Sequence, residues 1–318
     1  MAECILVTGG AGFIGYHIVR RLLEDGNRLR VIDNLSTGKE DRIDDLRASM
    51  EFVQADLADP VVSDDVVRGM DYVVHQAAVP SVQRSIEDPV GTNRSNITAT
   101  VNLLESCRKH RIRRLVYAAS SSAYGDTEVL PKTEDMTPTP LSPYALQKLV
   151  GEHYCKLYTS LFGLETVSLR YFNVFGPSQD PRSEYSAVIP MFVGRLLSGQ
   201  SLRVYGDGEQ SRDFTYVENV VQANVLALRA AHAAGKVFNV GCGSRITLNQ
   251  LIRFIERILG VRAVVEYVAP RSGDVRHSLA DINMAREVLG YEPRVMVREG
   301  LKRTVEWFRE RGSLRQCH

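Results

Sequence analysis

"VTGGAGFIG", residues 7–15, follows a short apolar run and precedes a segment with helical periodicity. Its glycines at 9, 12 and 15 keep a G-x-x-G-x-x-G spacing, and those at 10, 12 and 15 also fit G-x-G-x-x-G. Glycines at such a junction permit a tight turn and let backbone amides reach a pyrophosphate at the positive end of the helix. The stretch therefore predicts a strand, a phosphate-binding turn and a helix, with a Gly-rich turn that binds nothing as the alternative.

Two aspartates follow at spacings that suit a dinucleotide site. Asp33 ends the next strand-like run, 21 residues after Gly12. A carboxylate there would accept both ribose hydroxyls and repel a 2′-phosphate, which favours NAD over NADP. Asp56 follows "EFVQA" and is placed for the adenine edge, although a plain loop aspartate is an equal alternative.

Outward from this turn, short branched apolar runs alternate with helix-like stretches, a pattern typical of βα units on a parallel sheet buried on both faces. We therefore predict an α/β protein with a Rossmann-type doubly wound parallel sheet. After Pro177 the pattern changes to a polar loop followed by mixed helices and short strands. We assign residues 1–176 to the nucleotide-binding domain and 177–318 to a smaller mixed α/β substrate domain. Residues 213–241 are expected to return to the first domain.

Composition narrows the class of protein. The 318 residues are 44% hydrophobic and 24% charged, as in globular domains, and the net charge of +1 gives no reason to expect nucleic acid or an anionic membrane as a partner. No apolar run approaches the ~20 residues of a membrane span, and the first residues lack the features of a signal peptide. The cysteines show no metal-ligand spacing, so we expect no metal, reduced thiols and a cytoplasmic location; they stand at 4, 107, 155, 242 and 317.

A tyrosine and a lysine lie four positions apart in "SPYALQKLVGE", residues 142–152. Ser142 is a good N-cap and Pro143 suits the first helical position, so Tyr144 and Lys148 should share one face of a new helix. A nearby ammonium favours the phenolate, so Lys148 is expected to lower the pKa of Tyr144 and make it a base. An ordinary amphipathic helix is the alternative, because Y-x-x-x-K alone is a permissive pattern.

The glycine turn, "AASSSAYG" at 118–125 and "SPYALQK" together resemble the extended short-chain dehydrogenase/reductase family, in particular its NAD-dependent nucleotide-sugar epimerases and dehydratases. The resemblance covers nearly the whole chain and looks closest to the bacterial UDP-N-acetylglucosamine 4-epimerases. It continues through "LRYFNVFGP", "AVIPMF", "GDGEQSRDFTYV", "NVGCG" and "RSGDVRHSLADI".

The resemblance implies a role for each matching position. The implied catalytic residues are Ser120, Tyr144 and Lys148. The implied NAD-binding residues are Gly9, Gly12, Phe13, Ile14, Asp33, Asn34, Asp56, Leu57, Ala77, Asn96, Tyr144, Lys148 and Tyr171. The implied UDP-sugar contacts are Ser121, Ser122, Asn173, Val188, Arg212, Arg271, Asp274 and Ser278.

These roles imply epimerisation at carbon 4 of a UDP-hexose through a transient 4-keto sugar. Relatives that dehydrate carry Asp-Glu where this chain has Ser121 and Ser122, which argues against a dehydratase. Ser278 stands where glucose-restricted relatives have a tyrosine, so UDP-N-acetylglucosamine and its 4-epimer are the expected pair, with UDP-glucose and UDP-galactose secondary. The family also implies a homodimer packed through helices at about 92–110 and 143–162. A UDP-glucose 4-epimerase, a UDP-glucuronate epimerase or decarboxylase, and a non-catalytic NAD-sensing protein remain alternatives.

Overall fold

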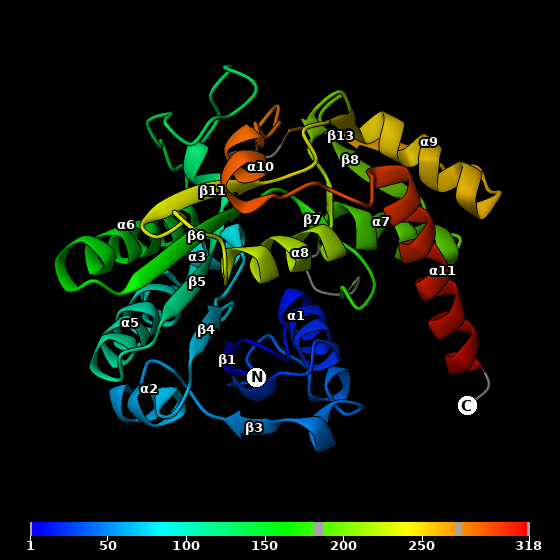
Figure 1. Ribbon diagram of the computed structural model, residues 1–318. Coiled ribbons are helices and arrows are strands. Elements are labelled where there is room, and N and C mark those ends of the chain that lie inside the picture. The colour runs from blue at the N-terminus through cyan, green and yellow to red at the C-terminus, as the bar shows by residue number, and fades with distance from the viewer. Residues whose placement is uncertain (1, 181–186, 271–274, 317–318) are drawn as a thin grey trace.

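A parallel sheet forms the centre of the protein, whose computed structural model describes residues 2–180, 187–270 and 275–316 (Figure 1). Within these residues the sheet has seven strands in the order β11-β6-β5-β4-β1-β2-β3. Their paired registers are all parallel, which confirms the predicted doubly wound sheet. The strands are β1 (Cys4–Thr8), β2 (Arg28–Asp33), β3 (Glu51–Gln54), β4 (Tyr72–His75), β5 (Arg114–Ser120), β6 (Glu165–Tyr171) and β11 (Lys236–Val240).

The strand order reverses between β1 and β4, which lie side by side although β2 and β3 separate them in the chain. Ligands of open α/β sheets bind outside the carboxyl ends of the strands at such a reversal. Thr8 and His75 end these two strands, and their side chains hydrogen-bond there, with 2.7 Å between Oγ1 and Nδ1. The fold therefore predicts a site above the carboxyl ends of β1 and β4.

Helices cover both faces of the sheet because alternate strand residues point to opposite sides. On β1, Ile5 and Val7 face one apolar core and Leu6 faces the other. The first core takes in α1 (Phe13–Glu24), α8 (Val217–Ala227) and α10 (Asn283–Leu289), and the second takes in α2 (Pro60–Val67), α5 (Ala99–Lys109) and α6 (Pro143–Phe162). Short helical segments link them: η1 (Glu40–Arg42), η2 (Arg47–Ser49), α3 (Val82–Glu87), α4 (Pro89–Asn93), η3 (Arg94–Thr98) and η4 (Ser121–Tyr124).

The two long helices of the second core begin differently. As the sequence predicts, the Ser142 hydroxyl accepts a hydrogen bond from the Ala145 nitrogen at 3.2 Å and Pro143 is the first helical residue. The helix α6 ends before Gly163, at φ 72°, which agrees with the limit of about 162 that the family resemblance implies. The helix expected at about 92–110 is interrupted instead. Its first residues belong to α4 and to the π-helical η3, and regular α-helix begins only at α5.

A third apolar core lies under the C-terminal elements, which Figure 1 shows at the upper right. It is built on α7 (Val188–Leu197), α9 (Leu248–Leu259) and α11 (Val297–Gln316). Short strand segments accompany these helices and pair with one another outside the main sheet; they are β7 (Val174–Phe175), β8 (Leu202–Tyr205), β9 (Ser211–Arg212), β10 (Thr215–Tyr216), β12 (Ile246–Thr247) and β13 (Val265–Val268). β11 lies in the main sheet although it comes between these elements in the chain. The domain limits at 176 and 177 stay a prediction.

Candidate active site

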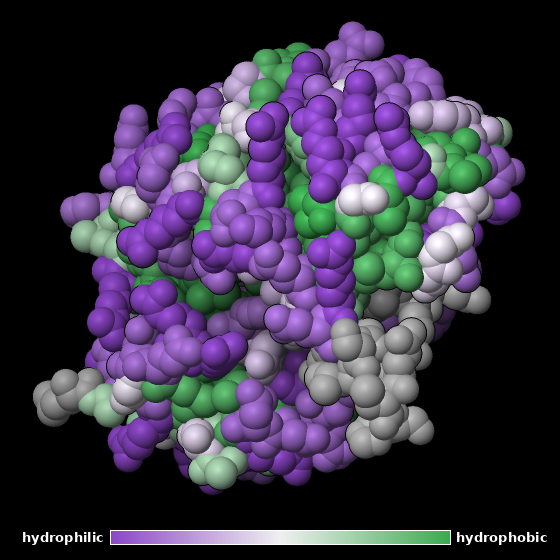
Figure 2. Space-filling view, turned by 90° about the vertical axis from the view of Figure 1, so that its right-hand side faces the viewer, coloured by the Kyte–Doolittle hydropathy of each residue, from purple (hydrophilic) through white to green (hydrophobic). Residues whose placement is uncertain are grey.

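A cavity of about 900 Å³ opens above the carboxyl ends of the central strands and extends to the C-terminal elements. Its lining includes the glycine turn, the end of β5, the start of α6 and the segment around Ser278. Figure 2 shows the molecule hollowed between its upper and lower parts, among mostly hydrophilic side chains. The cavity therefore lies where the reversal of strand order predicts a ligand.

The glycine turn has the shape that a bound pyrophosphate needs. Gly9 adopts φ 68°, and a Cβ there would lie 2.7 Å from the backbone of Ala77, so the two loops approach as closely as the backbone allows. At Gly12 a Cβ would meet only the Gly9 carbonyl oxygen, at 3.0 Å, which leaves the side toward the cavity open. Helix α1 begins at the next residue, Phe13. The turn thus offers backbone amides at a helix N-terminus to an anion.

Asp33 lies beside this turn at the end of β2. Its Oδ2 accepts a hydrogen bond from the Ala11 nitrogen at 3.0 Å, and its Oδ1 accepts one from the Leu35 nitrogen at 2.8 Å. Burial raises the pKa of Asp33, while these backbone hydrogen bonds and the Arg42 charge oppose the rise. The carboxylate is 8% exposed and lines the cavity, with lone pairs left for ribose hydroxyls. The turn, the cavity and the carboxylate together fit a dinucleotide.

Residues 177–180 follow β7 and contact side chains at the nucleotide end of the cavity. Arg42 Nη2 donates to the Ser178 carbonyl oxygen at 2.9 Å, and Lys39 forms an ion pair with Asp180. Arg42, Lys39 and Asp180 line the cavity, although sequence reasoning assigned them no role. No local pattern could have found them, because each contact joins positions more than 130 residues apart in the chain.

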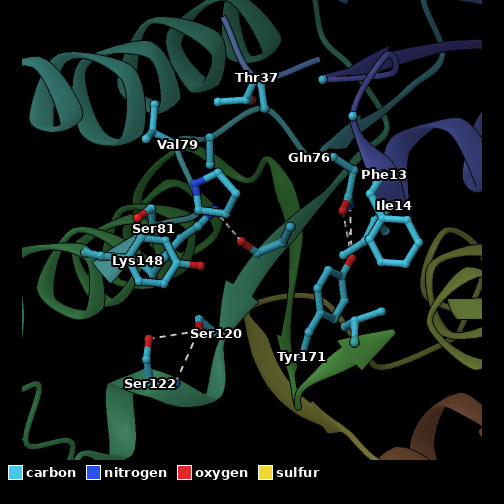
Figure 3. Close-up of a pocket in the computed structure, with 18 of the residues that line it drawn as sticks. Phe13, Ile14, Thr37, Gln76, Val79, Ser81, Ser120, Ser122, Lys148 and Tyr171 are labelled. Carbon is cyan, nitrogen blue, oxygen red and sulfur yellow. Dashed lines mark hydrogen bonds between the residues drawn. The ribbon is translucent and has the colours of Figure 1, made fainter. Parts of the chain in front are cut away.

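The serine triplet lies at the other end of the cavity, where β5 passes into η4. Ser120 Oγ accepts hydrogen bonds from the Ser122 nitrogen at 3.2 Å and from Ser122 Oγ at 2.8 Å (Figure 3). The Ser120 hydroxyl also acts on the nearby Tyr144 phenol, whose pKa it lowers, and both side chains line the cavity. The structure thus brings Ser120 and Tyr144 together from segments that are 24 residues apart.

Tyr144 and Lys148 both line the cavity, but their electrostatics differ from our expectation. Burial raises the pKa of Tyr144, and the hydrogen bond with Ser120 only opposes that rise. Burial also lowers the pKa of Lys148 to about 8, and its Nζ donates to the Ala118 carbonyl oxygen at 2.8 Å. The predicted lowering of the Tyr144 pKa is therefore wrong for this structure, because desolvation of the phenolate is the largest effect on this group and raises its pKa.

Tyr171 belongs to a polar network that the sequence did not indicate. Its hydroxyl accepts a hydrogen bond from Gln76 Nε2 at 3.0 Å (Figure 3). It accepts another from Asn224 Nδ2 at 2.8 Å. Gln76 lines the cavity beside Tyr171, and Asn224 is fully buried behind them. These contacts fix the orientation of the Tyr171 ring against the cavity.

Most of the predicted site residues line the cavity, and a few do not. Asn96 is 1% exposed, and its amide is taken up by the Val79 backbone and the Gln147 side chain, so it orders the cavity wall from behind. Val188 begins α7 one residue past the lining position Ala187. Arg271 and Asp274 lie outside the described residues. The lining contains Gly9, Gly12, Phe13, Ile14, Asp33, Asn34, Asp56, Leu57, Ala77, Ser120, Ser121, Ser122, Tyr144, Lys148, Tyr171, Asn173, Arg212 and Ser278.

A family model described as the NAD dependent epimerase/dehydratase family matches residues 5–241. The chain belongs to this family. A putative UDP-glucose 4-epimerase of Methanocaldococcus jannaschii is 42% identical over 307 residues, 96% of this chain and 98% of its own.

Two solved epimerases share the fold of this family member over nearly all of both chains. The Thermotoga maritima UDP-glucose 4-epimerase, solved with UDP-glucose, has a TM-score of 0.93 at 39% identity and covers 97% of this chain and 99% of its own. The Methanobrevibacter ruminantium UDP-N-acetylglucosamine 4-epimerase was solved with UDP-N-acetylmuramic acid. It also has a TM-score of 0.93 at 39% identity, and it covers 98% of this chain and 99% of its own.

NAD is the cofactor of this family, as predicted, and the residues that would hold it are those of the glycine turn, Asp33 and the lining of β4 and β5. Within the part of the chain that the structure describes, no cluster of His, Cys, Asp and Glu side chains is arranged to hold a metal ion. In that same part, none of the helices combines the length and the apolar character that a bilayer span needs.

Proposed function

We propose that the protein inverts carbon 4 of a UDP-hexose, with UDP-N-acetylglucosamine and UDP-N-acetylgalactosamine as its main pair and UDP-glucose and UDP-galactose as a secondary pair. One observation carries this proposal. Ser120, Tyr144 and Lys148 line the same cavity as the glycine turn, so a proton-transferring phenol and a dinucleotide site face one enclosed volume. The two solved structures with a TM-score of 0.93 are named as 4-epimerases, one of UDP-glucose and the other of UDP-N-acetylglucosamine. These names support the same reaction here.

The residues divide the reaction among them. Tyr144 takes the proton of the sugar's 4-hydroxyl and later returns it, while Ser120 hydrogen-bonds the same oxygen. NAD, when bound, would supply the hydride acceptor and donor for carbon 4. Lys148, still mostly protonated at neutral pH, would hold the cofactor's ribose. The cavity is wide enough for a 4-keto sugar anchored through its UDP to turn over, so that either face of carbon 4 could be presented to the cofactor.

Substrate choice rests on Ser278. It lines the cavity, is 7% exposed, and is fixed through its backbone nitrogen, which donates to the Ser211 carbonyl oxygen at 3.0 Å. A serine at this place leaves volume for the acetamido group of a rotating N-acetylhexosamine. A tyrosine would fill that volume.

The purified protein with a panel of UDP-hexoses tests the reaction. The expected result is interconversion of 4-epimers with no net consumption of NAD and the largest kcat/KM on the N-acetylated pair. Products are separated by chromatography and identified by NMR. Loss of water or of carbon dioxide from the sugar, or bound NAD with no turnover of any UDP-hexose, would contradict the proposal.

We also propose a homodimer in the cytoplasm. Leu146, Leu157 and Leu161 lie along one side of α6 and are 50%, 49% and 67% exposed, which leaves an apolar stripe on a long helix of the sheet's outer layer. Sedimentation at micromolar concentration should show a dimer, and Leu157→Glu should shift it to a monomer. Val61→Glu, on the exposed side of α2, is the matched control that leaves the dimer intact. A wild-type monomer would contradict the proposal.

A further inference from the structure

Lys132 is a buried cation that the proposed reaction does not use. It is 1% exposed and lines the cavity, and its Nζ donates one hydrogen bond, to the Gly125 carbonyl oxygen at 2.8 Å. An ammonium has three N–H donors. The other contact of Nζ among the described residues is with the Tyr124 ring, whose centroid is 5.9 Å away. Hydrogen-bonding capacity is therefore left over at the cavity wall.

Within the described parts of the chain, the charge of Lys132 also has no ion-pair partner. Among the described residues no carboxylate forms an ion pair with its Nζ; Asp126 acts on it only at longer range, and Arg212 repels it. A buried charge is costly unless it is paired. The protein does pair such a charge elsewhere, since Arg170 and Glu152 are each 4% exposed on their side chains and lie 2.8 Å apart. Burial lowers the pKa of Lys132, and the more distant charge of Asp126 opposes this only in part.

The ammonium of Lys132 lies near the sugar end of the cavity. The Gly125 carbonyl oxygen accepts the hydrogen bond of Lys132 Nζ. The nitrogen of the same glycine donates to the Ser122 carbonyl oxygen at 3.2 Å, and this bond closes η4, which begins just after Ser120. On its other side, the Lys132 backbone nitrogen donates to the Leu279 carbonyl oxygen at 2.8 Å. Lys132 thus connects the serine turn to the segment that carries Ser278.

We propose that Lys132 binds a carboxylate on the hexose, so that the enzyme accepts UDP-hexuronates as well as neutral UDP-hexoses. The inference rests on the proposed function, since it assumes that a UDP-hexose fills this end of the cavity. A carboxylate would offer acceptor oxygens to the remaining N–H groups and would compensate the buried charge in one contact. A sugar hydroxyl would accept one hydrogen bond but leave the charge unpaired.

Binding and turnover of wild type and Lys132→Met, measured with four ligands, test the proposal. Calorimetry gives the affinity for UDP, UDP-glucose, UDP-N-acetylglucosamine and UDP-glucuronate, and kcat/KM is measured for the three sugars. In Lys132→Met we expect the affinity for UDP-glucuronate to fall by about 10- to 150-fold, as for loss of a hydrogen bond to a charged group. Affinities for the other three should change by less than about threefold, because none of these ligands carries a carboxylate that could pair with the ammonium.

Two further variants separate this role from a merely structural one. Lys132→Gln keeps a hydrogen-bond donor for Gly125 and removes the charge. Its affinity for UDP-glucuronate should therefore fall as much as that of Lys132→Met. Lys236→Met, on β11 and outside the cavity lining, should change nothing. If Lys132→Met lowered the affinity for all four ligands equally, Lys132 would have a structural role or would contact the diphosphate, and the proposal would be wrong. A loss confined to UDP-N-acetylglucosamine would show an acetamido contact, and a wild type that does not bind UDP-glucuronate would also overturn the proposal.

The same measurements separate this inference from the proposed function. If Lys132→Met loses UDP-glucuronate binding selectively but the wild type epimerises no UDP-hexose, the assignment of Lys132 stands and the proposed reaction fails. If the wild type epimerises neutral sugars and Lys132→Met weakens all ligands alike, the reaction stands and the carboxylate site is wrong.

Discussion

The backbone nitrogen of Ala11 lies 3.0 Å from Asp33 Oδ2 and donates a hydrogen bond to it. The glycine turn and the carboxylate that we assign to the ribose are therefore one connected unit. Loss of the carboxylate should disturb both ends of the adenosine diphosphate at once.

We predict that NAD copurifies with the wild type and that Asp33→Ala retains little of it. The expected loss of NAD affinity is about 10- to 150-fold, the range for charge-assisted hydrogen bonds, with a rise in the relative affinity for NADP. The nucleotide released on denaturation is quantified by chromatography. Asp44→Ala, an exposed carboxylate that is outside the cavity lining, is the control. An Asp33→Ala protein with a full complement of NAD would show that this carboxylate does not bind the ribose.

Tyr144→Phe should lower kcat by about 100- to 10,000-fold, the usual contribution of a positioned acid or base, because the transferable proton is lost. The affinity for UDP-sugars should stay within about threefold, since the ring still fills its place. Steady-state kinetics and calorimetry give the two quantities. Tyr154→Phe removes a hydroxyl from the same helix without touching the cavity and should leave kcat unchanged. Near wild-type turnover by Tyr144→Phe would rule out the phenol as the base.

Ser278→Tyr should change substrate choice. Overpacking of a buried cavity position costs about 1–3 kcal/mol, so we expect kcat/KM on UDP-N-acetylglucosamine to fall about 5- to 150-fold more than on UDP-glucose. Competing assays on the two pairs measure the ratio directly. Ser201→Tyr, which adds the same ring at an exposed position, is the control. Equal losses on both pairs would mean that Ser278 does not set the room for the acetamido group.

His75 gives a prediction about pH. Burial lowers its pKa to about 3, so between pH 6.5 and 3 the unfolded chain takes up a proton that the folded protein does not. The free energy of unfolding should fall as the pH falls through this window, by up to ~1.4 kcal/mol per pH unit from this group. His75→Asn should remove that part of the slope in urea unfolding between pH 6 and 4. The exposed His232→Asn should keep it; identical slopes for both variants would contradict the buried neutral state.

Elements with local signals were predictable from the sequence. α6 carries its own start and stop, since Ser142, Pro143 and Gly163 act through atoms within one turn of the helix. The turn before α1 and the acid that ends β2 follow a spacing dictated by the cofactor and by backbone geometry. The cavity and most of its lining follow from these elements and the parallel sheet.

The remaining features depend on contacts that join distant parts of the chain. Asn96 has the residue type of a cofactor ligand, but the neighbouring Val79 and Gln147 take up its amide. The shift in the Tyr144 pKa depends on burial, which a four-residue spacing does not reveal. Lys132 resembles an ordinary polar loop residue in the sequence, and only the approach of residues 279–280 makes it a buried cation.

The place of β11 has a consequence for how the protein is made. This strand covers the outer side of β6, yet it is synthesised 65 residues after β6 ends. Until Lys236–Val240 leaves the ribosome, β6 presents a row of unpaired backbone donors and acceptors to other nascent chains. A truncated product ending at residue 176 would keep that edge permanently, so it should aggregate on expression even though it contains six strands of the sheet.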